Sequence, residues 1–201
     1  MSKPRRQNRS VLLSPRAAVA TVAAAAAVAS ITAVGATTAA ARPIGAFDVG
    51  GAIEAEYDRA GGFATFGNPI SPESDAARGG KFQVFEKNIS IYWSVGTDAH
   101  YVGGFIRDKW GSLGWENSPL GYPITDEQKA RKGDGRYNLF DGGSVYWSPK
   151  TGAHAVWGAI RDTWVSNVAE AGRYGYPTSD EYDYQGGKAQ DFQGGRITWH
   201  P

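Results

Sequence analysis

The chain has 201 residues, with 21 lysines and arginines against 20 aspartates and glutamates, and it contains no cysteine. The lack of cysteine excludes disulfides, thiolate catalysis and a lipid-modified cysteine anchor. Five of the basic residues and none of the acidic ones lie in residues 1–41, so residues 42–201 carry a net charge of −4. This charge balance argues against a role in binding nucleic acid.

Residues 1–41 have the composition of a secretory signal. A basic head is followed by an apolar stretch of mostly Ala and Val over residues 17–36, and Ala39-Ala40-Ala41 offers the small residues that a signal peptidase reads. We expect cleavage after Ala41 and a secreted protein. The alternative is an N-terminal membrane anchor, because the apolar stretch is about as long as a bilayer span.

A Gly-x-Pro step recurs along the rest of the chain at a spacing of 54 residues. Proline fixes its own φ and pushes the preceding residue into extended geometry, so each step predicts a firm turn. A short helix is predicted before each step, because an isoleucine and an aromatic residue four positions later share one helix face. The three steps begin at Phe66, Leu120 and Tyr174, and the three pairs are Ile53 with Tyr57, Ile106 with Trp110, and Ile160 with Trp164.

Two predicted strands follow each Gly-x-Pro step. In the second copy, residues 136–140 and 144–147 flank Asp141-Gly142-Gly143, which is a strong hairpin signal. The segments that join successive copies, residues 96–100 and 151–154, are interpreted as linkage only. The corresponding strands of the other copies are residues 81–85 with 89–93, and residues 188–192 with 196–199.

These patterns predict an α+β repeat protein of three units of about 54 residues, each a short helix, a Gly-x-Pro turn and a β-hairpin, packed pseudo-symmetrically. Asp191 replaces the apolar Val84 and Leu139 of the other copies, which indicates that one face of the last hairpin is open to water. The predicted division is a signal at 1–41, a leader at 42–50, and repeats at 51–104, 105–158 and 159–201.

Alternation along the second strand of each hairpin divides its side chains between two faces. A tryptophan shares one face with an apolar residue, so we assign that face to the core; the alternative is that the tryptophans are exposed stacking platforms. Tyr92 and Tyr146 then point to the opposite, accessible face. In the first strand, Phe85, Phe140 and Phe192 fall on the face of polar residues, so that either a bulge resets the alternation or the rings fold over the hairpin end. The tryptophans are Trp93, Trp147 and Trp199, beside Ile91, Val145 and Ile197.

Candidate ligand-binding residues are the tyrosines of the accessible face, polar side chains of the first strands, and a glutamate that recurs after each Gly-x-Pro step. A face that mixes polar and aromatic side chains is a better candidate for ligand binding than the apolar face. The recurring glutamates have an alternative role, in which they hold backbone amides of the turn. The candidates are Tyr92, Tyr146, Gln83, Asn138, Gln190, Arg136, Glu73, Glu127 and Glu181.

At these positions the sequence resembles the LGFP repeat family. Residues 120–123 carry the name motif with Tyr in place of Phe, and residues 140–149 and 151–160 fit the longer pattern, whereas the first copy departs most. The resemblance covers nearly all of residues 51–201. It implies a secreted protein in or near the envelope of mycolic-acid bacteria. In the family, such arrays often accompany mycoloyltransferases or peptidoglycan amidases as the anchoring, non-catalytic part, and arrays of five units resemble a compact ring.

Three classes of function are compatible with this sequence. We expect a secreted, non-catalytic module that binds cell-wall carbohydrate, arabinogalactan or peptidoglycan, through repeated weak sites that add avidity. The alternative is a structural or protein-docking role with an envelope enzyme or another copy of the chain. A hydrolase or esterase is favoured less, because the sequence lacks Gly-x-Ser-x-Gly and His-Glu-x-x-His, and an Asp98–His100 pair has Gly152 at the aspartate's place in the second copy. No cofactor or metal is expected, since His100 and His154 lack clustered ligands.

Overall fold

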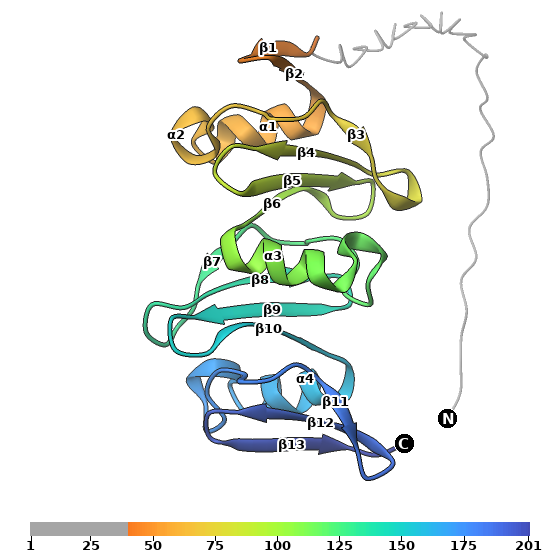
Figure 1. The fold of residues 1–201 in the computed structure, drawn as a ribbon, viewed down its shortest axis with the longest axis vertical. Helices are drawn as coiled ribbons and strands as arrows, with labels where there is room; N and C mark the ends of the chain where they lie inside the picture. The colour runs from red at the N-terminus through yellow and green to blue at the C-terminus, as the bar shows by residue number, and fades with distance from the viewer. Residues whose placement is uncertain (1–39) are drawn as a thin grey trace, which may run out of the picture. The chain divides into compact units, whose positions relative to one another are not determined.

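The structure is a computed structural model that describes residues 40–201. The predicted secretory signal, apart from its last two residues, lies outside the described residues. Within residues 40–201, no helix is both long enough and apolar enough to cross a membrane. Three modules follow one another along this part of the chain, each with a helix and an antiparallel sheet (Figure 1). The predicted α+β repeat architecture is therefore confirmed.

The first module is preceded by a short antiparallel hairpin of β1 (Arg42–Ile44) and β2 (Phe47–Val49). Its sheet has the strand order β3-β4-β5-β6, so each strand lies beside its neighbour in sequence. The elements of the module are α1 (Gly51–Arg59), α2 (Gly62–Phe66), β3 (Ser74–Asp75), the 3₁₀ turn η1 (Ala77–Gly79), β4 (Lys81–Phe85), β5 (Ile89–Ser94) and β6 (Asp98–Gly103).

The sheets of the second and third modules have the orders β7-β8-β9-β10 and β11-β12-β13, so within residues 40–201 the third sheet has no fourth strand. The second module consists of α3 (Gly104–Leu113), η2 (Trp115–Asn117), β7 (Gln128–Lys129), β8 (Arg136–Phe140), β9 (Gly143–Ser148) and β10 (Gly152–Trp157). The third consists of α4 (Gly158–Ser166), η3 (Ala169–Ala171), β11 (Tyr182–Tyr184), β12 (Gly187–Phe192) and β13 (Gly195–Trp199).

The segments predicted to be linkage instead form the edge strands β6 and β10, so that prediction is wrong. A tight turn after the second strand reverses the chain, with the amide of Thr97 donating to the carbonyl of Ser94 over 3.3 Å. The returning segment then pairs along its whole length, placing His100 opposite Tyr92 and His154 opposite Tyr146. Each edge strand runs directly into the next helix.

The short helices exist because they are buried between two sheets. An isolated helix of α3's length is marginal in water, so its stability must come from packing. Ile106 and Trp110, the predicted pair on one helix face, are 1% and 0% exposed. They pack with Val145 of their own sheet and with Tyr92 and Val102 of the sheet before it. Both faces of the first two sheets are therefore covered, one by the module's own helix and the other by the next helix.

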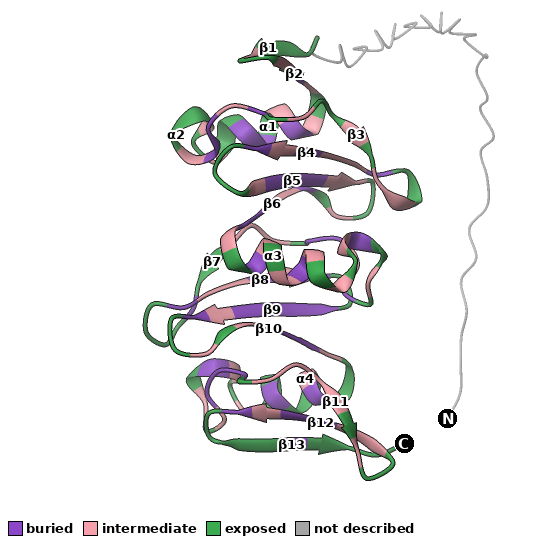
Figure 2. Ribbon diagram, in the orientation of Figure 1, coloured by how far each residue is buried: buried purple, intermediate pink, exposed green. Residues whose placement is uncertain are grey.

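This double coverage overturns the predicted accessible face. Tyr92 and Tyr146 are 4% and 7% exposed, and Figure 2 shows most of β9 as buried. The ring of Tyr92 lies 4.6 Å from that of Trp110, and the ring of Tyr146 lies 4.8 Å from that of Trp164, in both cases edge to face. These tyrosines do point away from the core of their own module, as the sequence predicts. The face to which they point is nevertheless buried, because it packs against the helix of the following module.

The assignment of the strand tryptophans to the core is also wrong. Trp199 is 42% exposed, and Trp93 and Trp147 are half-buried at the margins of the cores. The fully buried tryptophans are instead Trp110 and Trp164, one on each of the helices α3 and α4. The strand tryptophans lie near the ends of β5, β9 and β13, beyond the part of the sheet that the helix covers.

The phenylalanines of the first strands need neither a bulge nor a folded-over ring. The ladder between β4 and β5 is continuous from Lys81 to Phe85, so the alternation holds. Phe85 therefore shares its face with Gln83, and both side chains are fully buried. Each Gly-x-Pro step extends the sheet at this point, because its proline forms an isolated bridge with the phenylalanine: Pro69 with Phe85, Pro123 with Phe140, and Pro177 with Phe192.

Contacts between modules repeat in the same way at both junctions. The hydroxyl of Tyr122, the middle residue of a Gly-x-Pro step, donates to the carbonyl of Ala77 in the preceding module. The buried carboxylate of Glu116 accepts a hydrogen bond from the amide of Ala77 over 2.9 Å. A side chain on Gly80 would collide with the Tyr122 hydroxyl, so a glycine is needed there. The corresponding contacts at the second junction join Tyr176 to Lys132 and Glu170 to Arg131.

Candidate functional site

One combination of surface side chains recurs in all three modules and is here called the Trp–base–acid triplet. A basic residue on the first strand is the cross-strand partner of the strand tryptophan, so the two side chains stand next to each other on one face. The recurring glutamate lies in the segment that leads toward the sheet. The triplets are Glu73, Lys81 and Trp93; Glu127, Arg136 and Trp147; and Glu181, Lys188 and Trp199.

The first triplet lines a surface depression of about 300 Å³ beside the start of α1. The residues of α1 that line it together with the triplet are Gly51, Ala52 and Ile53.

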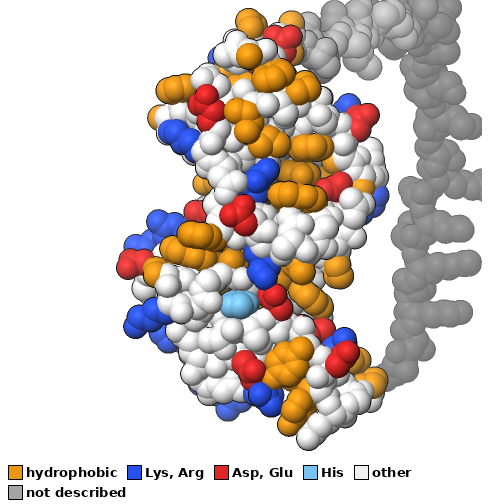
Figure 3. All heavy atoms as spheres, in the orientation of Figure 1, with side chains coloured by type: hydrophobic (Ala, Val, Ile, Leu, Met, Phe, Trp, Pro, Cys, Tyr) orange, Lys and Arg blue, Asp and Glu red, His pale blue; other side chains and the backbone are white. Residues whose placement is uncertain are grey.

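In the second triplet, the Trp147 ring stacks against Phe105, with ring centroids 5.6 Å apart and an angle of 11° between the ring planes. Phe105 is 64% exposed, so this pair is an aromatic surface open to solvent. Figure 3 shows clusters of hydrophobic side chains with charged groups beside them on the face in view.

Two of the three triplet glutamates, Glu127 and Glu181, are partly buried, whereas Glu73 is exposed. Burial raises the pKa of the Glu127 carboxyl, and the charge of Arg136, whose Nε lies 3.6 Å away, opposes the increase. Burial likewise raises the pKa of Glu181, against the charge of Lys188 and a contact with Trp157. A carboxylate, a cation and an indole edge therefore occur together in each module, with hydrogen-bond donors and acceptors around an aromatic ring.

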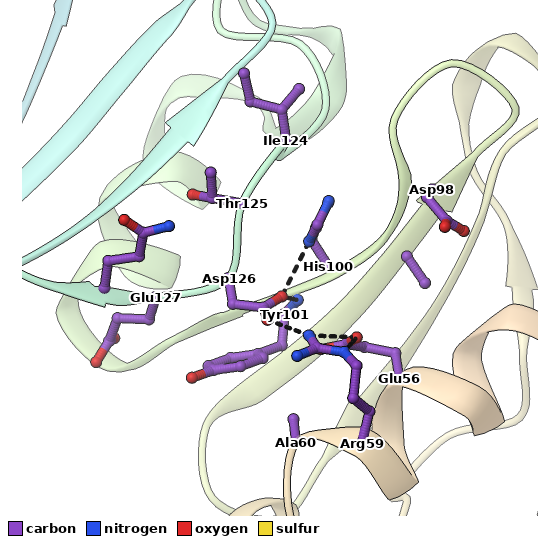
Figure 4. A pocket seen from close by; sticks show the side chains of 12 residues that line it. Glu56, Arg59, Ala60, Asp98, His100, Tyr101, Ile124, Thr125, Asp126 and Glu127 are labelled. Carbon is purple, nitrogen blue, oxygen red and sulfur yellow. Dashed lines mark hydrogen bonds and ion pairs between the residues drawn. The ribbon is translucent and has the colours of Figure 1, made fainter.

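A second candidate site is a depression of about 550 Å³ at the junction of the first two modules (Figure 4). Glu56 and Arg59 enter it from α1, His100 enters from β6, and Asp126 and Glu127 enter from the segment before β7. The guanidinium of Arg59 binds Glu56 over 2.7 Å and also pairs with Asp126. Nδ1 of His100 lies 3.0 Å from Oδ1 of Asp126, so one carboxylate of the second module pairs with two groups of the first.

The two carboxyl groups of this junction have opposite pKa shifts. Burial raises the pKa of Glu56 to about 7 in spite of the hydrogen bond from Arg59, and the nearby charge of Asp126 adds to the increase. Burial acts in the same direction on Asp126, but hydrogen bonds from His100 and Arg59 outweigh it and hold its pKa at about 2. Asp126 is therefore a permanent anion at neutral pH, whereas Glu56 exchanges a proton in that range.

The second junction has the same histidine–aspartate pair with a different cation. Nδ1 of His154 lies 3.2 Å from Oδ1 of Asp180, and Nζ of Lys109 lies 2.8 Å from Oδ2. The pKa of Asp180 is about 2, because hydrogen bonds from His154 and Lys109 outweigh the effect of burial. Because Nε2 of His154 faces the carbonyl of Thr151 over 2.9 Å, both ring nitrogens have partners. The recurrence of this pair indicates that its main role is to fasten one module to the next.

Several predicted site residues are structural. Gln83, Asn138 and Gln190 are fully buried. The side-chain NH₂ of each donates to two carbonyls, one on the strand that precedes the module's helix and one in the segment that follows the Gly-x-Pro step. Asn138, for example, reaches the carbonyls of Tyr101 and Thr125 over 3.0 and 2.9 Å. Burial takes these three amides, with Tyr92 and Tyr146, out of contact with solvent.

The remaining predicted residues, Arg136 and the three recurring glutamates, are brought together with the strand tryptophans. Within residues 40–201, none of these glutamates accepts a hydrogen bond from a backbone amide. The carboxylates that do so across the junctions are Glu116 and Glu170, which sequence patterns did not single out.

The junction residues Glu56, Arg59 and Asp126 were also missed, and the histidine was paired with the wrong aspartate. His100 contacts Asp126 of the next module, not Asp98, which lies two residues before it. A signal was present in the sequence, because His100 and His154 each precede an aspartate of a recurring hydroxyl-Asp-Glu segment by 26 residues. Within residues 40–201, no group of three or more histidine, aspartate or glutamate side chains is arranged to hold a metal ion.

The comparisons with known proteins agree with the repeat architecture. A family model of the LGFP repeat matches three stretches of the chain, residues 66–118, 120–172 and 175–201. The matches to the second and third repeats begin at or beside the Gly-x-Pro motif, so each takes in the sheet of one module and, where present, the helix of the next. No curated protein matches the sequence.

Proposed function

We propose that this chain, which belongs to the LGFP repeat family, is a secreted, non-catalytic module that anchors to the cell wall by binding envelope carbohydrate. The supporting observation is the Trp–base–acid triplet, which recurs once per module with the tryptophan and the base as direct cross-strand partners. The ligand class, arabinogalactan or peptidoglycan, follows from the envelope location that the family resemblance implies.

The chemistry of the triplet suits a sugar ligand. An indole surface packs against the C–H face of a pyranose or furanose ring, and the adjacent carboxylate and cation accept from and donate to its hydroxyls. Each triplet is shallow and would bind weakly. Three triplets on one chain, facing a polymer with many equivalent sugars, would gain avidity without any new contact.

A non-catalytic role is favoured by how the titratable groups are used. The strongest acid–base cluster, at the first junction, has Glu56 and Asp126 engaged by Arg59 and His100. Attack on a bound substrate needs a group that can reach it, and these side chains are occupied in holding two modules together.

The test is sedimentation of the purified protein with insoluble cell wall, with and without its covalent polysaccharide. We expect retention that disappears when the polysaccharide is removed. Trp93→Ala, Trp147→Ala and Trp199→Ala should each weaken retention, and their combination should abolish it. The matched aromatic control is Phe63→Ala, because Phe63 is 61% exposed but belongs to no triplet.

The charged members of the triplet are tested in the same assay. Arg136→Ala should lower retention, whereas Arg173→Ala, which also removes an exposed arginine that contacts an aromatic ring, should not. If the wild-type protein is retained equally on wall stripped of polysaccharide, or on neither material, the carbohydrate proposal is wrong.

A further inference from the structure

The last sheet of the chain is incomplete in comparison with the other two. In the first two sheets, β5 and β9 lie between two partner strands, and the outer partners, β6 and β10, run directly into the next helix. Within residues 40–201, β13 pairs with β12 alone. No following helix covers its outer face in this part of the chain, and Figure 2 shows β13 as exposed where β9 is buried.

The N-terminal hairpin shows what such an edge can bind. β2 leads into α1 as β6 leads into α3, and Val49 corresponds to Val102 and Val156, all of which are fully buried. In the complete sheets, the residues opposite these valines are Ser90 and Ser144. Opposite Val49 is Arg42, on the short strand β1. β1 therefore occupies, at the N-terminal end, the place that β5 or β9 occupies in the full modules.

The last sheet carries an arginine at the same place. Arg196 of β13 corresponds to Ser90 and Ser144, because each of the three lies three residues before the strand tryptophan. The register agrees, since Arg196 lies opposite Asp191 as Ser144 lies opposite Leu139. The side chain of Arg196 is 43% exposed, its Nε donates to Oδ1 of Asp191 over 2.7 Å, and its guanidinium lies over the Tyr184 ring at 4.9 Å. Arg42 and Arg196 are therefore two partly exposed arginines in equivalent positions, one paired with carboxylates of α1 and the other with Asp191 of its own sheet.

The charge on the helix decides which helix can face such an arginine. On α1, the residue next to the buried isoleucine is Glu54, and Arg42 binds its carboxylate over 2.8 Å. The same position on α3 and α4 is Arg107 and Arg161, and Arg107 donates instead to Ser90 over 2.7 Å. An arginine on the strand is thus complementary to α1 and repelled by α3 and α4. Among the helices described, α1 is the one that fits the last sheet.

From this complementarity we propose that the β2–α1 segment of a second copy docks on the C-terminal sheet, with β13 displacing β1 from its pairing with β2 and Arg196 replacing Arg42 beside Glu54. In the register of the complete sheets, Arg196 would lie opposite Val49 of the second copy and Thr198 opposite its Phe47. The interface joins one end of a copy to the opposite end of the next, so association is head-to-tail and produces chains or closed rings. This inference does not depend on carbohydrate binding, although a chain of copies would multiply the number of triplets.

The first test is sedimentation velocity over a range of concentrations, with the 201-residue chain expressed in a secreting host. We expect association that grows with concentration. Arg196→Glu should weaken it at least about tenfold, because the new carboxylate would face Glu54. Lys188→Glu is the matched control, because this substitution makes the same change of charge on the opposite face of the same sheet. Circular dichroism and urea unfolding check that each variant is folded.

A charge exchange separates this interface from any other mode of self-association. Glu54→Arg should also weaken association when it is alone, because it would face Arg196. Mixing the Glu54→Arg and Arg196→Glu proteins should restore association between the two variants. If the wild-type protein stays monomeric at every concentration, or if Arg196→Glu leaves association unchanged, the proposal is overturned.

The register between β2 of one copy and β13 of the next is tested by disulfide cross-linking. Because the chain has no cysteine of its own, only the introduced cysteines can react. Phe47→Cys and Thr198→Cys proteins, mixed under oxidising conditions, should form a disulfide between copies. Phe47→Cys mixed with Trp199→Cys should cross-link much less, because neighbouring residues of a strand point to opposite faces. Equal yields from the two mixtures, or no cross-linked product from either, would contradict the proposed pairing.

Discussion

His100 and Asp126 lie 26 positions apart in sequence and belong to different modules, yet Nδ1 of the first lies 3.0 Å from Oδ1 of the second. The same carboxylate pairs with Arg59 of the first helix and accepts from the amide of Tyr101 over 3.4 Å. A single aspartate thereby links the helix and edge strand of one module to the turn of the next. Its removal is the most direct test of how the modules are joined.

Asp126→Asn should lower the free energy of unfolding by about 1–3 kcal/mol, because charge-assisted hydrogen bonds at a partly buried site are lost. Urea unfolding measures the change. The control is Asp98→Asn, an exposed aspartate two residues from His100, which should have an effect within about 0.5 kcal/mol. A larger effect from Asp98 than from Asp126 would mean that the histidine is paired within its own module.

The pH dependence of stability follows from the shifted carboxyl groups. Asp126 and Asp180 have pKa values lowered to about 2, so the stability they contribute is complete above their ordinary pKa of 3.8 and is lost as the pH falls through 2. Glu56 has the opposite sign, because its pKa is raised from 4.5 to about 7. The folded state holds that proton more tightly, so stability falls as the pH rises across this interval.

The urea concentration at the midpoint of unfolding, measured between about pH 2 and pH 7, should therefore pass through a maximum at about pH 4 to 5. In Glu56→Gln the decline toward neutral pH should vanish, while the acid limb stays. A variant that keeps the full decline would show that another group titrates there.

Tyr146→Ala should destabilise the protein by about 3–5 kcal/mol, since truncation of a large buried ring leaves a cavity between two modules. The ring stacks on Tyr137 at 4.7 Å and meets Trp164 edge to face. Thermal and urea unfolding measure the loss. Trp147→Ala, at the half-buried margin, should cost less stability and should lower retention on cell wall. The reverse ranking of the two stability losses would contradict the burial described here.

Asn138→Asp should destabilise more than Asn138→Ala. The side-chain NH₂ of Asn138 donates to two carbonyls from different modules, and aspartate would place a buried carboxylate against both. Alanine leaves the carbonyls unpaired, at a cost of about 1–3 kcal/mol for each buried unsatisfied group. Comparison of the urea unfolding curves gives the difference. If aspartate is tolerated as well as asparagine, the two hydrogen bonds from Asn138 do not contribute to stability as described here.

Much of the architecture could be predicted because it is local and repeated. The helix pairs such as Ile106 with Trp110, the Gly-x-Pro turns and the hairpin around residues 141–143 depend on periodicity and turn chemistry that each segment carries by itself. The polar residue Asp191 also indicated that one face of the last sheet is open to water, and its side chain is 37% exposed in the structure. Three copies in one frame made these weak local signals specific.

The tertiary structure alone decided which faces are buried and which residues meet. Alternation showed that Tyr92 and Trp93 lie on opposite faces, but it could not show that a second helix covers the tyrosine. That helix follows the strand β6, and its packing depends on contacts between modules that no single repeat contains. The meeting of His100 with Asp126, and of Arg42 with Glu54, depends likewise on elements brought together by stacking. Sequence periodicity describes one element at a time, whereas burial and charge pairing are properties of two elements in contact.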